Sequence, residues 1–384
     1  MSLHEQHATF ARPETKIRLS LLGTALVDAL GAPAEFHPRF TFEWVTDMIP
    51  NKNFGLSPGV WTDDTSMTLC LAESLSKCKD DGGFSEVHQL DTYSRWKRQG
   101  HLSAVGRCFD IGNTIRMALS IFAQGKRDAA LSNIRAKLGA ESNAGNGSLM
   151  RVLPIGLVYW RNLERAKEFA RRSSSTTHPT QMCTEACEIW TGAISLIMQH
   201  TTSDMLLSKL ALFEYFATYP YQNRKLKEAL AMPSDIGPPP DGPTARETWY
   251  QTHHPLLRLI ADTRKQAPKG KYPYALPSSK QLPSTGYVLH TFVAALFGFF
   301  ATNTFEEGAI MVVNLGDDAD TVGAIYAGLS ACWYAGDDDG AEAKALFWSD
   351  RVQRWEKNLV ERVAVEHVAE GLASRESIER AGNE

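Results

Sequence analysis

The chain has 384 residues, of which 43% are hydrophobic and 22% are charged, a composition that is typical of globular proteins and excludes a disordered or fibrous chain. Its 40 Lys and Arg residues nearly balance 44 Asp and Glu residues, giving a net charge of −4. No basic cluster stands out, so nucleic-acid binding has no electrostatic support. The most apolar stretch, 288–301, is shorter than the roughly 20 residues of a membrane span, and we expect no membrane association.

The N-terminus and the cysteines indicate the cellular compartment in which the protein is expected to reside. Residues 1–7 lack the basic start and the apolar core of a signal peptide. The six cysteines are scattered along the chain, which is typical of reduced thiols rather than a disulfide framework. We therefore expect a monomeric protein in the cytoplasm.

Apolar residues recur at helical spacing through most of the chain, first over residues 17–29 and then over 67–75. Further helices are predicted over residues 114–122, 129–138, 163–172, 182–198, 203–216, 286–301, 306–313, 321–334 and 341–363. Period-two alternation is scarce. The pattern predicts a compact all-α fold with a single domain over residues 1–384 and a core over about 17–370.

Two segments depart from the helical pattern. Residues 233–283 are rich in proline, including Pro238, Pro239 and Pro240, and lack helical periodicity. Because proline breaks helices, we expect this segment to be a surface insertion. The polar residues 374–384 are expected to form a frayed tail.

Thr62, Asp63 and Asp64 stand where a loop rich in Gly and Pro leads into an apolar helix. Carboxylate and hydroxyl oxygens suit hard cations such as Mg²⁺ or Mn²⁺, and adjacent carboxylates at a helix start can point into one site. The alternative is that Thr62 or Asp63 caps the helix and that Asp64 interacts favourably with the helix dipole.

The same pattern recurs near the other end of the chain. Asp317, Asp318 and Asp320 place three carboxylates within four residues, followed by Thr321 and a helix rich in small residues that is suited to burial. Carboxylates this close repel one another unless a cation is present. Two such clusters predict a two-metal site of oxygen ligands, with the ions about 3.5–4 Å apart.

Three more features could carry chemistry. The turn 145–151 can expose backbone N–H groups to a phosphate, or it is a plain glycine turn. Glu35 lies in an apolar loop in which a raised pKa would suit acid or base work, or it is a surface residue. Asp110 lies between apolar residues before a helix, with a helix cap as the alternative.

His178, Cys183 and Cys187 together raise the question of a zinc site. A fourth ligand at suitable spacing is missing, and two cysteines on an apolar helix face are usually core residues. Core packing is therefore favoured for this group.

The motifs, taken in order, resemble the ADP-ribosylglycohydrolase family, which includes the dinitrogenase-reductase-activating glycohydrolases. The matching segments, over roughly 17–334, are Gly23 with Asp28 to Glu35, Trp61 to Thr65, Phe109 to Asn113, Gly145 to Arg151, Thr177 to Pro179, and Gly316 to Thr321. Six motifs in order are far more specific than any one of them. Val27, Asp317 and His290 depart from the family pattern, but none of them is an expected metal ligand.

The resemblance implies an all-α fold, two Mg²⁺ ions, and hydrolysis of the glycosidic bond at C1″ of ADP-ribose. The implied metal ligands are Thr62, Asp63, Asp64, Asp318, Asp320 and Thr321. Glu35 resembles the family's mobile acidic residue, and Asp110 resembles the acidic residue near the ribose. The implied substrate-binding residues are Gly145, Asn146, Gly147, Ser148, Met150 and His178, of which the glycine turn would hold the diphosphate and the distal ribose.

The expected function is release of ADP-ribose from an ADP-ribosylated protein or small molecule, with an arginine acceptor favoured because a carboxylate can bind a guanidinium in two-pronged fashion. Two alternatives stay open: a phosphoesterase acting on derivatives such as ADP-ribose 1″-phosphate, and a non-catalytic ADP-ribose-binding relative. The sequence does not decide whether Glu35 or Asp110 is the general acid.

Overall fold

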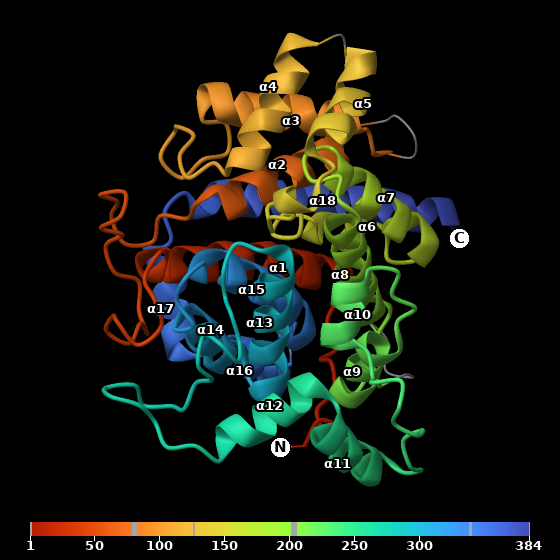
Figure 1. The fold of residues 1–384 in the computed structure, drawn as a ribbon. Helices are drawn as coiled ribbons and strands as arrows, with labels where there is room; N and C mark the ends of the chain where they lie inside the picture. The colour runs from red at the N-terminus through yellow and green to blue at the C-terminus, as the bar shows by residue number, and fades with distance from the viewer. Residues whose placement is uncertain (1, 79–82, 126, 201–205, 338–339, 384) are drawn as a thin grey trace.

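The computed structural model describes residues 2–78, 83–125, 127–200, 206–337 and 340–383, and over these residues the chain folds into helices joined by loops, with three isolated β-bridges and no strand (Figure 1). The α-helices are α1 (Pro13–Gly31), α2 (Asp63–Lys77), α3 (Glu86–Gln99), α4 (Asn113–Gln124), α5 (Arg127–Leu138), α6 (Leu153–Tyr159), α7 (Leu163–Ser175), α8 (Gln181–Gln199), α9 (Lys209–Thr218), α10 (Arg224–Leu230), α11 (Pro243–His253), α12 (Pro255–Arg264), α13 (Val288–Ala301), α14 (Phe305–Val313), α15 (Ala319–Tyr334), α16 (Ala341–Phe347), α17 (Asp350–Asn358) and α18 (Arg362–Asn383). Two 3-10 turns, η1 (Ala32–Ala34) and η3 (Glu141–Asn143), complete the set used below. The predicted all-α fold is confirmed.

Helices α1 and α15 pair along the centre of the molecule, and α2 and α18 pack on α1 while α13 and α14 pack on α15 (Figure 1). The central pair packs closely because small residues face each other: a Cβ on Gly31 would lie 2.7 Å from the carbonyl oxygen of Ala319. This contact brings the end of α1 against the start of α15. Residues that follow α1 therefore lie beside residues that precede α15.

Helix α1 with η1, Pro13–Ala34, is long and apolar enough to cross a membrane by length and composition alone. Within the described chain, 89% of its apolar window is buried among the other helices. Its apolarity is thus explained by its position at the centre of the core.

Most of the predicted helices are confirmed to within a few residues at each end; they correspond to α1, α2, α4, α5, α7, α8, α13, α14 and α15. Two predicted helices differ. The helix expected over 203–216 begins only at Lys209, although its first residues, 203–205, lie outside the described chain. The helix expected over 341–363 is interrupted, because Ser349 caps a new helix by accepting a hydrogen bond from the backbone N–H of Val352.

The expectation that residues 233–283 contain no helix is wrong, since α11 and α12 lie in this segment. Pro243 and Pro255 each stand in the first turn of a helix, where proline costs no hydrogen bond and its fixed φ favours the helical backbone. Leu256, Leu257 and Ile260 of α12 are buried, so the segment contributes to the core as well as to the surface.

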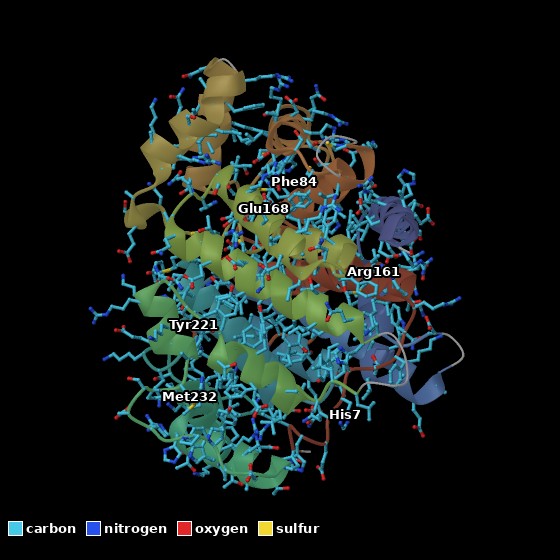
Figure 2. All side chains as sticks on the ribbon, turned by 90° about the vertical axis from the view of Figure 1, so that its right-hand side faces the viewer. His7, Phe84, Arg161, Glu168, Tyr221 and Met232 are labelled. Carbon is cyan, nitrogen blue, oxygen red and sulfur yellow. The ribbon has the colours of Figure 1, made fainter. Side chains whose placement is uncertain are left out.

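The expectation of a frayed tail over 374–384 is also wrong up to residue 383, because α18 continues through it. Glu376 is fully buried and accepts a hydrogen bond from Trp160 Nε1 at 3.2 Å, and it forms an ion pair with Arg161. Figure 2 shows Arg161 beside this helix. Buried, paired charges fix a helix that its polar composition alone does not predict.

Candidate active site

A cleft of ≈ 540 Å³ opens beside the start of α15, a volume that is within the usual range for small-molecule sites. Its lining comes from the loops after η1, before α2, before α4, around residue 146, before α13 and before α15. The predicted site residues among its lining are Glu35, Asp63, Asp110, Gly145, Asn146, Gly147, Met150, His178, Asp318, Asp320 and Thr321. The structure therefore gathers residues from distant parts of the chain around one cleft.

Thr62 occupies the N-cap position of α2, but its side chain makes no cap hydrogen bond. Its hydroxyl instead donates to Asp28 Oδ1 of α1 at 2.9 Å, and the Thr65 hydroxyl donates to Asp28 Oδ2 at 2.6 Å. The backbone N–H groups of Thr62 and Thr65 also donate to the Asp28 carboxyl. Asp28 thus fixes the start of α2, and Asp63 and Asp64 are held in the first turn.

Asp318 likewise occupies the N-cap position of α15 without capping it. Its Oδ2 accepts a hydrogen bond from Asn146 Nδ2 at 2.6 Å. The two acidic clusters touch beneath the cleft, because Thr321 Oγ1 lies 3.1 Å from Asp64 Oδ2 and Thr62 Oγ1 lies 3.4 Å from Asp320 Oδ2. The helix-cap alternative does not account for these side chains.

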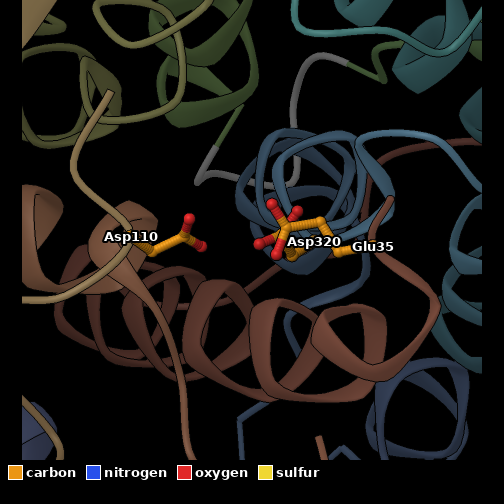
Figure 3. Close-up of side chains that lie close together, drawn as sticks. All are labelled: Glu35, Asp110 and Asp320. Carbon is orange, nitrogen blue, oxygen red and sulfur yellow. The ribbon is translucent and has the colours of Figure 1, made fainter. Parts of the chain in front are cut away.

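Three carboxyls converge in the cleft: oxygen atoms of Glu35, Asp110 and Asp320 lie within 4.8 Å of one another (Figure 3). Asp63 and Asp318 line the same cleft without belonging to this group. Asp110 has a φ of +57°, and Gly112 is the N-cap of α4, so Asp110 is not a helix cap.

Burial and neighbouring carboxylates raise the pKa of six carboxyls in and beneath the cleft, those of Glu35, Asp63, Asp64, Asp110, Asp318 and Asp320. Burial, followed by the charges of Asp320 and Asp110, raises the pKa of Glu35 far above its ordinary value. Burial is also the largest cause of the raised pKa at Asp110, which reaches about 6. The pKa values of the metal-ligand candidates Asp63, Asp64, Asp318 and Asp320 are raised chiefly by burial, and neighbouring carboxylates add to the effect at each of them.

The donor set suits a hard cation. All six predicted metal-ligand residues offer carboxylate or hydroxyl oxygens, and no Lys or Arg is present among the described residues that line the cleft. Two buried oxygens, Asp64 Oδ1 and Glu35 Oε2, have no hydrogen-bond partner within the described chain. Unpartnered buried oxygens amid like charges are what a bound cation would satisfy, so the residues present fit a divalent metal ion.

The glycine turn lines the same cleft and contacts Asp318 through Asn146. The backbone N–H of Asn146 donates to the carbonyl of Gly286 at 3.0 Å. A Cβ on Gly147 would lie 2.8 Å from Ile115 Cδ1 and 2.9 Å from His178 Cε1, so any larger residue there would displace these side chains. Ser148 faces away from the cleft: it is buried, and its hydroxyl accepts a hydrogen bond from Ser174 Oγ at 2.9 Å.

His178 lies under the glycine turn, with Nδ1 2.8 Å from Thr177 Oγ1. Burial, and secondarily the charge of Arg151, lowers the pKa of His178 to about 3, so its ring is neutral at neutral pH. Cys183 Sγ donates to the carbonyl of Gly145, whereas Cys187 Sγ donates to Ser148 Oγ. Within the described residues, His178, Cys183 and Cys187 do not converge as ligands, in agreement with core packing.

Sequence reasoning missed two buried arginines that position the site. Arg151 donates to the carbonyl of Gly147 and, at 2.7 Å, to Thr177 Oγ1, which fixes the glycine turn. Arg39 donates to the carbonyls of Leu315, at 2.9 Å, and Leu282, at 2.7 Å, and so ties the loop after Glu35 to the loop before Asp318.

The role of Asp28 was also missed, although the residue lies within a recognised motif. The sequence does indicate this role, because a lone carboxylate in an otherwise apolar helix must find buried hydrogen-bond donors. The donors it finds, Thr62 and Thr65, flank the first acidic cluster.

Comparison with known proteins identifies related sequences. The family described as ADP-ribosylglycohydrolase matches residues 9–376 of the chain. An ADP-ribosylarginine hydrolase, Tri1, of Pseudomonas putida is 28% identical over 349 residues, covering 89% of this chain and 77% of the relative. An ADP-ribosyl-(dinitrogen reductase) glycohydrolase of Rhodospirillum rubrum is 25% identical, covering 83% of this chain and 85% of the relative.

A solved structure described as an ADP-ribosylglycohydrolase-related protein complex is also similar. It aligns with a TM-score of 0.63 and 29% sequence identity, covering 95% of this chain and 99% of the solved chain. The similarity in structure therefore extends over nearly the whole of both chains.

We expect Mg²⁺ to stabilise the fold more strongly at pH 7.5 than at pH 5.5. A carboxyl with a raised pKa holds a proton in the metal-free fold, and this proton binding adds to the free energy of unfolding at low pH. The added stability is lost as the pH rises through the raised pKa. A cation must displace these protons, so proton competition weakens its binding at low pH. At a free Mg²⁺ concentration of about 100 times Kd, binding adds about 2.7 kcal/mol to the free energy of unfolding.

The measurement is the difference in Tm with and without Mg²⁺ at each pH. Using the difference cancels the opposite trend of His178 and His254. Their lowered pKa values make the fold gain stability as the pH rises up to about 6.5, above which this gain is complete. Asp318→Asn should remove most of the Mg²⁺ effect, whereas Asp47→Asn, at a half-exposed carboxyl outside the cleft, should keep it. A Mg²⁺ effect independent of pH would contradict the site.

Proposed function

The chain belongs to the ADP-ribosylglycohydrolase family, and on this premise we propose that it releases ADP-ribose from arginine side chains of ADP-ribosylated proteins, with divalent metal ions as cofactors. It is an ADP-ribosylglycohydrolase, as the named activities of its relatives indicate. The observation that carries the finer proposal is the cleft itself. The carboxyls of Glu35, Asp63, Asp110, Asp318 and Asp320 line it, and that of Asp64 lies beneath it, where a cationic acceptor and divalent cations would bind. The relative named for ADP-ribosylarginine supports the choice of acceptor.

The proposed substrate position follows from the residues that line the cleft. Gly145 and Gly147, on either side of Asn146, have no side chain to keep a diphosphate from the backbone, and Arg151 places a buried positive charge behind this turn. Met150 and the neutral ring of His178 add apolar surface for the distal ribose. The C1″ atom then lies toward the acidic wall formed by Glu35, Asp110 and Asp320.

Thr62, Asp63, Asp64, Asp318, Asp320 and Thr321 would hold the metal ions, which we propose are two Mg²⁺ ions, with Mn²⁺ as the chemically similar substitute. When bound, such ions supply positive charge to ribose hydroxyls and to water. Asp28 and Asn146 orient the ligands through the hydrogen bonds described above.

The chain's own carboxyls can manage the protons of the reaction. Hydrolysis breaks the bond from C1″ to the guanidine nitrogen and joins the oxygen of a water molecule to C1″, through a transition state with oxocarbenium character. Glu35 keeps its proton at neutral pH because burial and neighbouring carboxylates raise its pKa, so it can donate that proton to the leaving nitrogen. Asp110, with a lower pKa of about 6, can accept the proton that the attacking water releases.

The direct test is a comparison of three substrates: an ADP-ribosylarginine peptide, an ADP-ribosylserine peptide and ADP-ribose 1″-phosphate. We expect Mg²⁺-dependent release of ADP-ribose to be fastest from the arginine-linked peptide, and EDTA to abolish it. The readout is free ADP-ribose measured by chromatography. Faster cleavage of the serine-linked peptide or of the 1″-phosphate would overturn the arginine assignment, and no release from any of the three would overturn the proposed hydrolysis at C1″.

We expect Glu35→Gln and Asp110→Asn to lower kcat by about 10²–10⁴-fold, the usual contribution of a general acid or base. The dependence of kcat on pH should differ between the two variants. Without the general acid, kcat no longer falls at high pH, and without the general base, kcat no longer falls at low pH.

Glu43→Gln serves as the matched control for both variants. It changes an exposed carboxyl on the loop that follows Glu35 and should leave kcat as it is. If Glu35→Gln instead removes the fall of kcat at low pH, Glu35 is the base and Asp110 is the acid.

A further inference from the structure

Three phenyl rings form a row that begins at Phe36, which lines the cleft, and continues through Phe54 to Phe109. The centroids of Phe36 and Phe54 lie 6.2 Å apart, and those of Phe54 and Phe109 lie 5.6 Å apart, both edge to face. Phe36 directly follows Glu35, and Phe109 directly precedes Asp110. We define these three residues as the phenyl row, and its two ends flank the two carboxyls that would handle protons.

Phe36 is an unusual residue in two respects. Its φ is +64°, a left-handed conformation that is unfavourable for a bulky side chain, and its backbone N–H donates to the carbonyl of Asp317 at 2.7 Å. Its side chain lines the cleft, yet the residue is 62% exposed. Packing does not explain an exposed ring on a strained backbone, because burial of the ring contributes little to the stability of the fold.

The surroundings of Phe36 suit a planar cation. Glu35, Asp110 and Asp320 provide negative charge in the same cleft, and among the described lining residues there is no Lys or Arg to repel a cation. At the other end of the phenyl row, the guanidinium of Arg107 already lies 5.7 Å from the centroid of the Phe109 ring. The row therefore has one end covered by a guanidinium and the other end, Phe36, open to the cleft.

We propose that Phe36 is the residue that selects the acceptor, because the face of its ring binds the guanidinium of the ADP-ribosylated arginine. This inference rests on the proposed function. A guanidinium is flat, delocalised and weakly hydrated, so it stacks on aromatic rings more readily than other cations. A serine-linked acceptor offers no such group, and the ring then discriminates between acceptors without contacting the ADP-ribose that all substrates share.

The experiment compares the wild type with Phe36→Leu, Phe36→Ala and Phe36→Trp. Leucine keeps an apolar side chain but removes the ring, whereas tryptophan retains an aromatic face that binds cations more strongly. KM and kcat are measured with the ADP-ribosylarginine peptide, and Kd is measured calorimetrically for ADP-ribose alone. Phe10→Leu, at a partly exposed phenylalanine that does not line the cleft, is the matched control.

We expect Phe36→Leu and Phe36→Ala to raise KM for the arginine-linked peptide about two- to fivefold, the effect of losing one cation–π contact at an exposed ring, while kcat and the Kd of ADP-ribose stay as in the wild type. Phe36→Trp should keep KM at or below the wild-type value. If Phe36→Leu matches the wild type, the ring does not bind the guanidinium. If the Kd of ADP-ribose rises together with KM, Phe36 belongs to the shared ADP-ribose site, and the inference is wrong.

Failure of the proposed function gives a different result from failure of the role proposed for Phe36. A wild-type enzyme that does not cleave the arginine-linked peptide overturns the proposed function. Calorimetric binding of that uncleaved peptide to the wild type and to Phe36→Leu still measures the contribution of the ring, and equal affinities would then overturn the role of Phe36 as well.

Discussion

Mutual repulsion among six carboxyls, of which four are buried and those of Asp110 and Asp318 are partly buried, is the constraint on which the rest of the structure depends. Glu35, Asp63, Asp64, Asp110, Asp318 and Asp320 come from loops and helix starts that are brought together by the close packing of α1 against α15. Concentrating like charges in a buried cleft costs stability unless protons or cations neutralise them. The surrounding structure holds the carboxyls in place, through Asp28 beneath α2, Asn146 beside Asp318, and Arg39 between the loops.

The same constraint links the fold to the chemistry. Burial and neighbouring carboxylates raise the pKa values of Glu35 and Asp110 in the metal-free fold, and raised pKa values suit these two residues to exchange protons with a substrate. Divalent cations would neutralise the carboxyls of the two helix starts in the working enzyme. An acceptor that is itself a cation would add to this neutralisation, and the exposed residue Phe36 lines the same cleft.

The helices and the acidic clusters could be predicted because their signals are local. Periodic apolar residues and adjacent carboxylates are visible within a few positions of the chain, as at Asp63 and Asp64. The helices α11 and α12 could not be predicted from the proline content of their segment, because proline usually breaks helices, whereas Pro243 and Pro255 stand in the first turn of these two helices. The convergence of Glu35 with Asp110 depends on loops with positive φ, at Phe36 and at Asp110 itself, which no local pattern of this sequence reveals.

The central claim, that the two acidic helix starts form one site for divalent cations, is tested most directly by a crystal structure of the protein with Mn²⁺. Anomalous scattering locates Mn²⁺ without reference to the protein atoms. We predict two anomalous peaks in the cleft, within coordination distance of the carboxylates of Asp63, Asp64, Asp318 and Asp320. A well-occupied Mn²⁺ ion elsewhere, with no peak between the starts of α2 and α15, would contradict the account.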